Sequence, residues 1–138
     1  MEFVQTRPVL THSGVMVMLA AAIAQAEGMG VPQCIVIVDA SGEVLGEVRM
    51  TGAKFLSRRS AKAKALTAAS GGVASAMIAE AARLPLGMAS QGGVTGLPGG
   101  LPVRFGGLLA GAIGVGSGTG EQDVRVAQAA LAAVGADA

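Results

Sequence analysis

Residues 1–39 combine one helical pattern with one strand pattern. Thr11 or Ser13 can cap a helix that runs to about Glu27, where glycines and then Pro32 end it. Residues 33–39 form an apolar, β-branched run without alternation, which is typical of a strand covered on both faces. The pattern therefore predicts a helix followed by a central strand.

A β-hairpin is predicted next. Residues 40–43 supply turn chemistry, and residues 43–49 alternate between two faces, as a half-buried strand does. If Ser41-Gly42 is a two-residue loop, counting along both strands places Arg49 opposite Cys34. The same register leaves Asp39 near the tip of the hairpin.

The pattern in the middle of the chain predicts two helices followed by a long irregular loop. Residues 53–70 contain helix formers without proline or glycine, and residues 73–83 can form a short third helix that ends before Pro85. Residues 84–102 hold three prolines and many glycines, so no long regular element is expected there. Loops of this length in a compact domain are usually functional.

The last part of the chain predicts a second hairpin and a final helix. Residues 101–105 and 108–115 indicate two strands joined at Gly106-Gly107. Thr119 and Gln122 form a capping box that starts a helix reaching about residue 134. Two hairpins separated by helices favour a mostly antiparallel sheet over parallel crossovers, so we expect an α+β sandwich.

Length and composition indicate one domain that assembles with copies of itself. Of the 138 residues, 51% are hydrophobic and 14% are charged, which excludes a disordered chain and leaves room for a single domain over residues 1–138. Small residues dominate the apolar part. So much apolar surface on a short chain suggests burial between subunits, and we expect a homo-oligomer, either a dimer or a higher assembly.

Charge and hydropathy limit the partners and the location. The net charge is +1 and the chain lacks tyrosine and tryptophan, so nucleic acid is not an expected partner. The apolar run at residues 15–24 is too short to span a membrane, and its weak basic flank argues against a secretory signal. The single cysteine, Cys34, lies in an apolar run, which indicates a small buried side chain and fits a reducing, cytoplasmic location.

His12 is the only histidine, which excludes zinc sites that need several imidazoles. Its imidazole can serve as an axial haem ligand or as a lone general base. It can equally be a solvated or capping residue in the first turn of a helix. The residue pattern leaves these interpretations open.

A glycine-rich segment at residues 114–120 follows a strand and precedes a helix, as nucleotide-binding loops do. Glu121 and Asp123 would repel a phosphate at that helix start, and no further strand follows to hold a ribose. We therefore interpret the segment as a strand exit followed by a capped helix.

Two other features can form an anion site. Five cations lie in or beside the predicted second helix with no acid among them: Lys54, Arg58, Arg59, Lys62 and Lys64. One interpretation is that all five line a solvated face of the helix. The other is that one of them points into a pocket and, together with Arg49, pairs with the carboxylate of a ligand. Residues 92–102 expose backbone amides that can cradle an anion, or else they form an irregular connection.

Several motifs resemble one known family. They are Val38-Asp39-x-x-Gly42, Arg49-Met50-x-Gly52-Ala53, Ala61-x-x-Lys64-Ala65-x-Thr67-Ala68, Leu97-Pro98-Gly99-Gly100-x-Pro102 and Gly111-Ala112-Ile113-Gly114-Val115, together with Ser57 and Asp123. With this spacing the chain resembles the GlcG/HbpS family from about Leu10 to Val134. The family includes the C-terminal domain of the PduO adenosyltransferase and is often described as haem-binding or haem-degrading.

The resemblance implies a profilin-like or roadblock-like α+β fold, in which a five-stranded, mostly antiparallel sheet is flanked by helices and the chains form dimers or larger rings. The hydrophobic pattern supplies only four strands, so we expect the fifth within residues 92–99. The candidate site residues are those that match the family motifs: Arg49, Gly52, Ala53, Lys64, Leu97, Gly99 and Gly100. Thr51 departs from the family pattern, in which an aspartate commonly follows the Arg-Met pair.

Two functions are consistent with these residues. One is an oligomeric small-molecule-binding protein whose pocket for an anionic, carboxylated ligand lies between the second helix and the glycine-proline loop. Haem is the ligand that the resemblance implies, and its carboxylates would meet Arg49 and Lys64. No family motif covers His12, which is the candidate metal ligand because it lies in the N-terminal helix and is the only histidine. The other is a cofactor-independent isomerase, lyase or hydrolase for a carboxylated or enolic catabolite, with Arg49 and Lys64 as catalytic residues. A scaffold for a larger enzyme is a third, weaker possibility.

Overall fold

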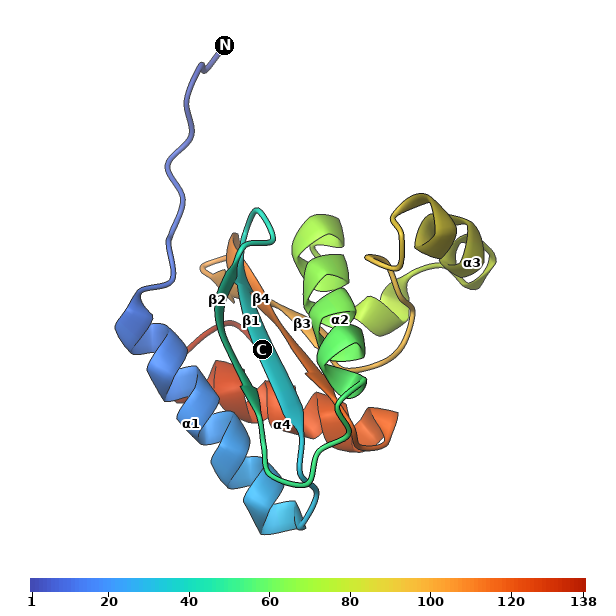
Figure 1. The fold of residues 1–138 in the computed structure, drawn as a ribbon. Helices are drawn as coiled ribbons and strands as arrows, with labels where there is room; N and C mark the ends of the chain where they lie inside the picture. The colour runs from blue at the N-terminus through green and yellow to red at the C-terminus, as the bar shows by residue number, and fades with distance from the viewer.

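The computed structural model describes all of residues 1–138 and shows a four-stranded antiparallel sheet between two layers of helices (Figure 1). The elements are α1 (His12–Met29), β1 (Cys34–Asp39), β2 (Val44–Arg49), α2 (Ser57–Gly71), α3 (Glu80–Ala89), β3 (Gly100–Phe105), β4 (Leu108–Gly116) and α4 (Gly120–Ala133). The strand order is β2-β1-β4-β3. Helices α1 and α4 cover one face of the sheet, and α2 covers the other.

The expected fifth strand is absent. Residues 92–99 contain no strand, because their backbone groups bond to side chains instead. The Thr95 N–H donates to Thr67 Oγ1 at 3.0 Å, and the Ser75 hydroxyl donates to the Leu97 carbonyl at 2.6 Å. The α+β class with an antiparallel sheet flanked by helices is therefore confirmed, and the five-stranded sheet is wrong. The likeness to profilin or roadblock folds stays a prediction.

The first hairpin has the predicted register from Cys34, opposite Arg49, to Ile37, and a β-bulge between Ile37 and Val38 changes the register toward the tip. Its loop is longer than two residues, because β1 ends at Asp39 and β2 starts at Val44. The Asp39 carboxylate accepts hydrogen bonds from the N–H groups of Ser41 and Glu43, at 2.8 and 3.0 Å. An aspartate that bonds to the backbone in this way stabilises the turn at the tip of the hairpin.

The first and last helices begin at the predicted caps. The Thr11 hydroxyl accepts from the Gly14 N–H at 3.1 Å, and Gly30 ends α1 in the left-handed conformation at φ 69°. Thr119 and Gln122 exchange both hydrogen bonds of a capping box at the start of α4. None of the helices combines the length and the apolar character of a membrane-spanning segment.

The prediction of a helix at residues 73–83 is wrong. Residues Ser75–Met77 form a single 3-10 turn, and α3 continues through Pro85 to Ala89. A proline inside a helix removes one backbone hydrogen bond. Because no residue of α3 is buried, water can satisfy the carbonyl that Pro85 leaves unpaired. The second helix also begins later than expected, at Ser57.

Helix α2 packs very close to the sheet. A Cβ atom on Gly114 of β4 would overlap the Ala61 carbonyl oxygen, and one on Gly100 of β3 would overlap the Lys64 carbonyl oxygen. Small residues on both surfaces therefore set the distance between the layers. This close approach brings the first turns of α2 against the starts of β3 and α4.

Candidate functional site

A small polar pocket lies where the first turns of α2 and α4 meet the loop before β3. Its volume is about 240 Å³. The lining residues are Lys54, Ser57, Ser60, Lys64, Leu97, Pro98, Ser117, Gly118, Gly120 and Asp123. We call this cavity the polar pocket; it contains two of the candidate site residues, Lys64 and Leu97, and three further residues of the family motifs, Ser57, Pro98 and Asp123.

The charge of Lys64 is paired inside the protein. Its ammonium donates to the Asp123 carboxylate and to the Val115 carbonyl, both at 2.8 Å, and the other Asp123 oxygen accepts from the Gly118 N–H at 3.0 Å. The side chains of Lys64 and Asp123 are only 5% and 3% exposed. The carboxylate that meets Lys64 therefore belongs to the chain itself.

Gly99 and Gly100 allow the loop to pass against this ion pair. A Cβ atom on Gly99, whose φ is 126°, would lie 3.1 Å from the Lys64 side chain and 3.0 Å from Asp123. Gly100 donates its N–H to the Ser75 hydroxyl at 2.9 Å, and the same hydroxyl donates to the Leu97 carbonyl. The structure thus brings Lys64, Leu97, Gly99 and Gly100 together.

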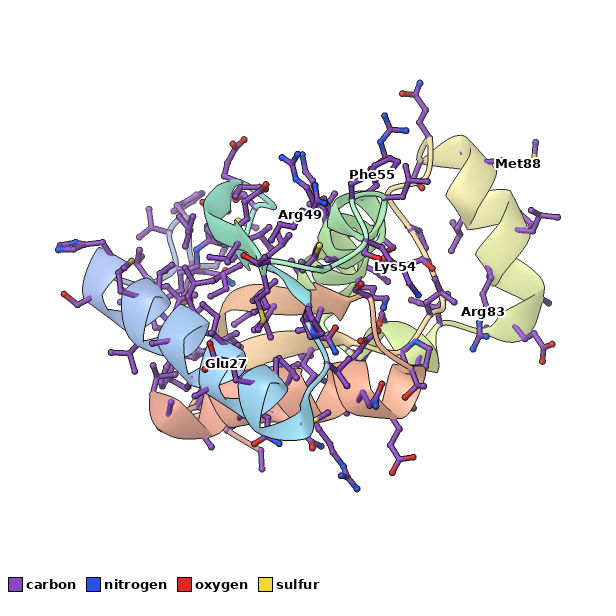
Figure 2. The ribbon with its side chains drawn as sticks, turned by 60° about the horizontal axis from the view of Figure 1, so that its bottom comes forward. Glu27, Arg49, Lys54, Phe55, Arg83 and Met88 are labelled. Carbon is purple, nitrogen blue, oxygen red and sulfur yellow. The ribbon has the colours of Figure 1, made fainter.

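The other candidate residues lie at a separate groove. Arg49 lines an open groove of about 550 Å³ between the end of β2 and the C-terminal half of α1, and no residue of this groove lines the polar pocket. The Arg49 Nε donates to the carbonyl of the buried Ala53 at 3.1 Å, and Gly52 turns the chain at φ 93°. Figure 2 shows Arg49 near Lys54 and Phe55, which follow it on the segment between β2 and α2. Arg49 and Lys64 therefore do not line one cavity.

Cys34 is buried between the sheet and α2, as expected. Burial raises the pKa of the Cys34 thiol above its ordinary value, and the positive charges of Arg49 and Arg58 lower this pKa only in part. The thiol donates a weak hydrogen bond to the Lys54 carbonyl at 3.6 Å. A neutral, buried thiol is a packing group and a poor nucleophile.

His12 lies on the surface, away from both cavities. It is the first residue of α1 and is exposed, and it lines neither the polar pocket nor the Arg49 groove. Met16, one turn further along α1, is 64% exposed, and Val9, just before the helix, is 75% exposed. The imidazole thus stands beside apolar side chains that nothing in the chain covers.

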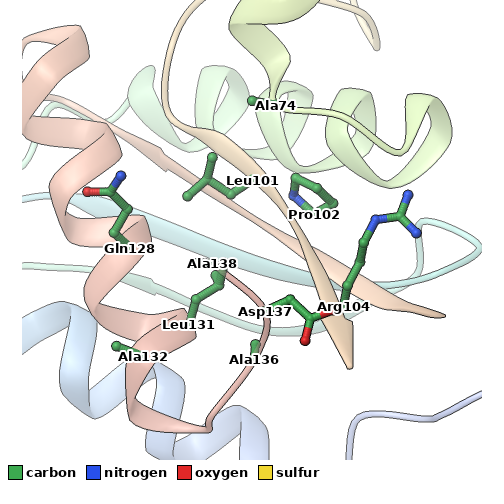
Figure 3. Close-up of a pocket in the computed structure, with 10 residues that line it drawn as sticks. All are labelled: Ala74, Leu101, Pro102, Arg104, Gln128, Leu131, Ala132, Ala136, Asp137 and Ala138. Atoms are coloured by element: carbon green, nitrogen blue, oxygen red, sulfur yellow. The ribbon is translucent and has the colours of Figure 1, made fainter. Parts of the chain in front are cut away.

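A third, more apolar cavity lies between β3, α4 and the C-terminal residues (Figure 3). Its volume is about 530 Å³, and it is lined by Pro102 of the family motifs but by none of the seven candidate site residues. At its edge the Asp137 carboxylate accepts from the N–H groups of Gly106 and Gly107, at 3.2 and 2.7 Å. The C-terminal residues are therefore fastened to the turn between β3 and β4.

Sequence reasoning selected neither Asp123 as the partner of Lys64 nor Gln33 as a buried polar residue. Asp123 lies in the first turn of a capped helix, where the helix dipole favours an acid even without an ion-pair partner, so its position did not indicate a pair with Lys64. Gln33 is fully buried, and neither polar atom of its side chain has a partner. Its position at the start of an apolar strand was the only available signal. No group of three or more histidine, cysteine, aspartate or glutamate side chains is arranged to hold a metal ion.

Comparison with known sequences identifies relatives over most of the chain. Residues 10–132 match the family model described as haem-degrading protein HbpS-like. The corrinoid adenosyltransferase PduO of Citrobacter freundii is 38% identical over 119 residues, which cover 83% of this chain and 36% of that protein. The chain thus spans about a third of the length of the curated relatives that it matches.

Solved structures share the same domain. The Klebsiella pneumoniae protein ORFY has a TM-score of 0.91 at 31% identity, over 100% of this chain and 99% of ORFY. A PduOC–haem complex has a TM-score of 0.88 at 30% identity, over 94% of this chain and 98% of the other. Since the family model and these relatives all cover most of the chain, this protein belongs to the HbpS-like family.

Proposed function

We propose that the protein binds haem, and that its exposed His12 ligates the iron. The support is its place in a family described as haem-degrading, together with its likeness to a PduOC–haem complex over 94% of the chain. A shared fold does not assign ligand atoms.

His12 is the residue that fits haem iron best. It is the only imidazole of the chain, and the one cysteine is buried beneath α2. Imidazole is a common axial ligand of haem iron, and the ring of His12 is accessible. The exposed apolar side chains of Val9 and Met16 beside it suit the faces of a porphyrin. Haem, when bound, would supply its own iron chemistry, and His12 would fix the position of the iron.

Arg49 is the cation that we propose for a carboxylate of the ligand. Within the chain it uses only its Nε, so its terminal N–H groups remain available for a bidentate contact. The groove that it lines includes Glu27, which lies fifteen residues along α1 from His12, or roughly 20 Å at the usual helical rise. One ligand that meets both residues would therefore lie between two subunits.

A homo-oligomer is part of this proposal. The exposed face of α1 carries Met16, Val17, Ala20 and Ala24, so it offers apolar groups to solvent where charged ones are usual. Burial of this face against a second copy would cover it and would enclose a ligand bound at His12.

The alternative, a cofactor-independent enzyme, has less support. It needs Lys64 as an acid or base, or as a cation for the substrate. The Lys64 ammonium already donates to Asp123 and Val115, and a substrate carboxylate would have to displace Asp123 from a buried ion pair. We therefore assign Lys64 a structural role at the polar pocket.

Haem titration followed by absorption spectroscopy tests the proposal. We expect a shifted Soret band that saturates with haem, and we expect His12→Ala to abolish this shift while the far-ultraviolet circular dichroism stays unchanged. Ser13→Ala, at the exposed neighbouring position, is the matched control and should bind as the wild type does. An unchanged Soret band and affinity in His12→Ala would show that the proposed ligand is wrong.

A further inference from the structure

Two helices present their N-termini to the polar pocket. Ser57 begins α2 and Gly120 begins α4, and both line the pocket. Helix α2 has no side-chain cap and no acid in its first turn. The first N–H groups of α2 donate to the carbonyls of residues 54–56, so α2 adds its dipole, whereas the Gly120 N–H at the start of α4 has no partner within the fold. A helix dipole and an unsatisfied N–H group both favour an anion.

The charges of the pocket add to this effect. Lys64 and Asp123 neutralise one another, which leaves the Lys54 ammonium as the uncompensated charge of the lining. Lys54 takes part in none of the three ion pairs of the protein. Glu121, which would repel an anion at the start of α4, pairs with Arg125 and is not part of the lining.

An unpartnered buried amide lies against the wall of the same pocket. The Gln33 side chain is 0% exposed, and neither its nitrogen nor its oxygen has a hydrogen-bond partner. A Cβ atom on Gly118 would lie 2.5 Å from the Gln33 nitrogen and 2.9 Å from an Asp123 oxygen, and both Gly118 and Asp123 line the pocket. The amide therefore lies next to Gly118, which lines the pocket, although Gln33 itself is not part of the lining. A buried polar group without a partner is costly and calls for an explanation beyond packing.

We propose that the polar pocket binds a small oxyanion, a carboxylate or a phosphate, separately from the haem site proposed above. Lys54 would supply the charge, the Gly120 N–H at the start of α4 would donate a hydrogen bond, and Gln33 would support the loop at Gly118. The volume of about 240 Å³ is below the range of pockets for drug-sized ligands, so the ligand is an acid or ester of a few carbon atoms.

The loop at the pocket contains one residue with an unusual backbone conformation. Ser117 has a φ of 94°, which is unusual for a residue other than glycine, and its hydroxyl accepts from the Lys54 N–H at 3.0 Å. The hydroxyl proton of Ser117 is then free to point into the pocket. Strain of this kind is common where a loop holds a ligand, and here it agrees with the charge and the buried amide.

Titration with sodium phosphate and with sodium acetate, followed by nuclear magnetic resonance of the backbone amides, tests the proposal. We expect saturable shifts at Ser117, Gly118 and Gly120, and the tighter of the two ions identifies the class of oxyanion. Lys54→Ala should weaken binding about tenfold, because the only free charge is lost, and Lys54→Arg should retain it.

The matched control is Lys62→Ala, an exposed lysine of α2 that does not line the pocket. It should bind within about twofold of the wild type, since its charge is screened by solvent. Gln33→Met should weaken binding without unfolding the protein. Equal losses in Lys54→Ala and Lys62→Ala, or no saturable shift with either ion, would overturn the proposal whatever the result of the haem titration.

Discussion

The ammonium of Lys64 lies 2.8 Å from the carboxylate of Asp123, and this pair connects α2 to α4, which cover opposite faces of the sheet. The pair contacts the end of β4, where the Val115 carbonyl accepts a hydrogen bond from the Lys64 ammonium. It therefore joins α2, α4 and the end of β4 beside the polar pocket. A buried ion pair of this kind adds little net stability, because both charges lose their hydration. Removing one partner is nevertheless costly, and this cost favours the arrangement of the helices in which the pair is intact.

Asp123→Ala should lower the free energy of unfolding by about 3–5 kcal/mol, because it leaves the Lys64 ammonium buried without its counter-charge. Urea unfolding measured by circular dichroism gives this value. Glu47→Ala is the control: it breaks the exposed pair with Arg58, whose side chains are 39% and 59% exposed, and should cost less than about 1 kcal/mol. Similar losses in both variants would show that the buried pair has no special role.

Gly114→Ala should lower the free energy of unfolding by about 3 kcal/mol or more, because the new methyl group would overlap the Ala61 carbonyl oxygen and push α2 from the sheet. Gly28→Ala is its control. Nothing lies within 4 Å of a Cβ atom at Gly28, in the last turn of α1, so alanine should raise stability there by about 0.5–1 kcal/mol.

Thermal or urea unfolding measures the stability of both variants. Since each is a glycine-to-alanine substitution, the two results can be compared directly. A stable Gly114→Ala protein would mean that α2 does not need to approach the sheet so closely. Destabilisation by Gly28→Ala would mean that α1 has a contact at its C-terminal end which one chain does not contain.

The local features of the fold were predictable because neighbouring residues determine them. The capping box of Thr119 and Gln122 spans a single helical turn, and the register of Cys34 with Arg49 follows from counting around one short loop. The start of α4 and the first hairpin could thus be derived from sequence alone. The predicted helix at residues 73–83 is wrong because proline does not always end a helix: the exposed helix α3 continues through Pro85.

The candidate site was less predictable because distant residues form it. Lys64 and Asp123 are 59 residues apart, and no periodic pattern links a lysine in one helix to an acid in another. The basic residues in α2 and just before it look alike in the sequence, yet Lys64 is buried and paired, whereas Lys54 is exposed and takes part in no ion pair. Arg49 and Lys64 were expected at one pocket because both match family motifs, but a shared motif does not require a shared cavity. The expected fifth strand failed for a related reason: Ser75 and Thr67 bond to the loop where a strand partner was expected.

Gln33→Met should raise the free energy of unfolding by about 1–3 kcal/mol, because an apolar side chain of similar size replaces a buried amide without partners. The same change should weaken oxyanion binding, as a group retained for function would. Gln128→Met, at an exposed position of α4, is the control and should leave stability unchanged within about 0.5 kcal/mol. Lower stability in Gln33→Met would indicate that the amide has partners within the fold after all.

The Cys34 thiol should make stability fall at alkaline pH. Burial raises the pKa of this thiol in the folded protein, so the unfolded chain loses the proton first. Its contribution is therefore fully present below the pKa of an unfolded thiol, about 8.5, and is lost as the pH rises toward the folded value. In Cys34→Ala this part of the decline should disappear. The difference between the two proteins in urea unfolding from pH 8 to 10 therefore separates the contribution of the thiol from that of the lysines.

Alkylation by iodoacetamide at pH 8 should also be slow and should accelerate only with unfolding, since the thiol is 1% exposed. Rapid alkylation of the folded protein, or an identical pH dependence in Cys34→Ala, would mean that the thiol is accessible and ionises normally.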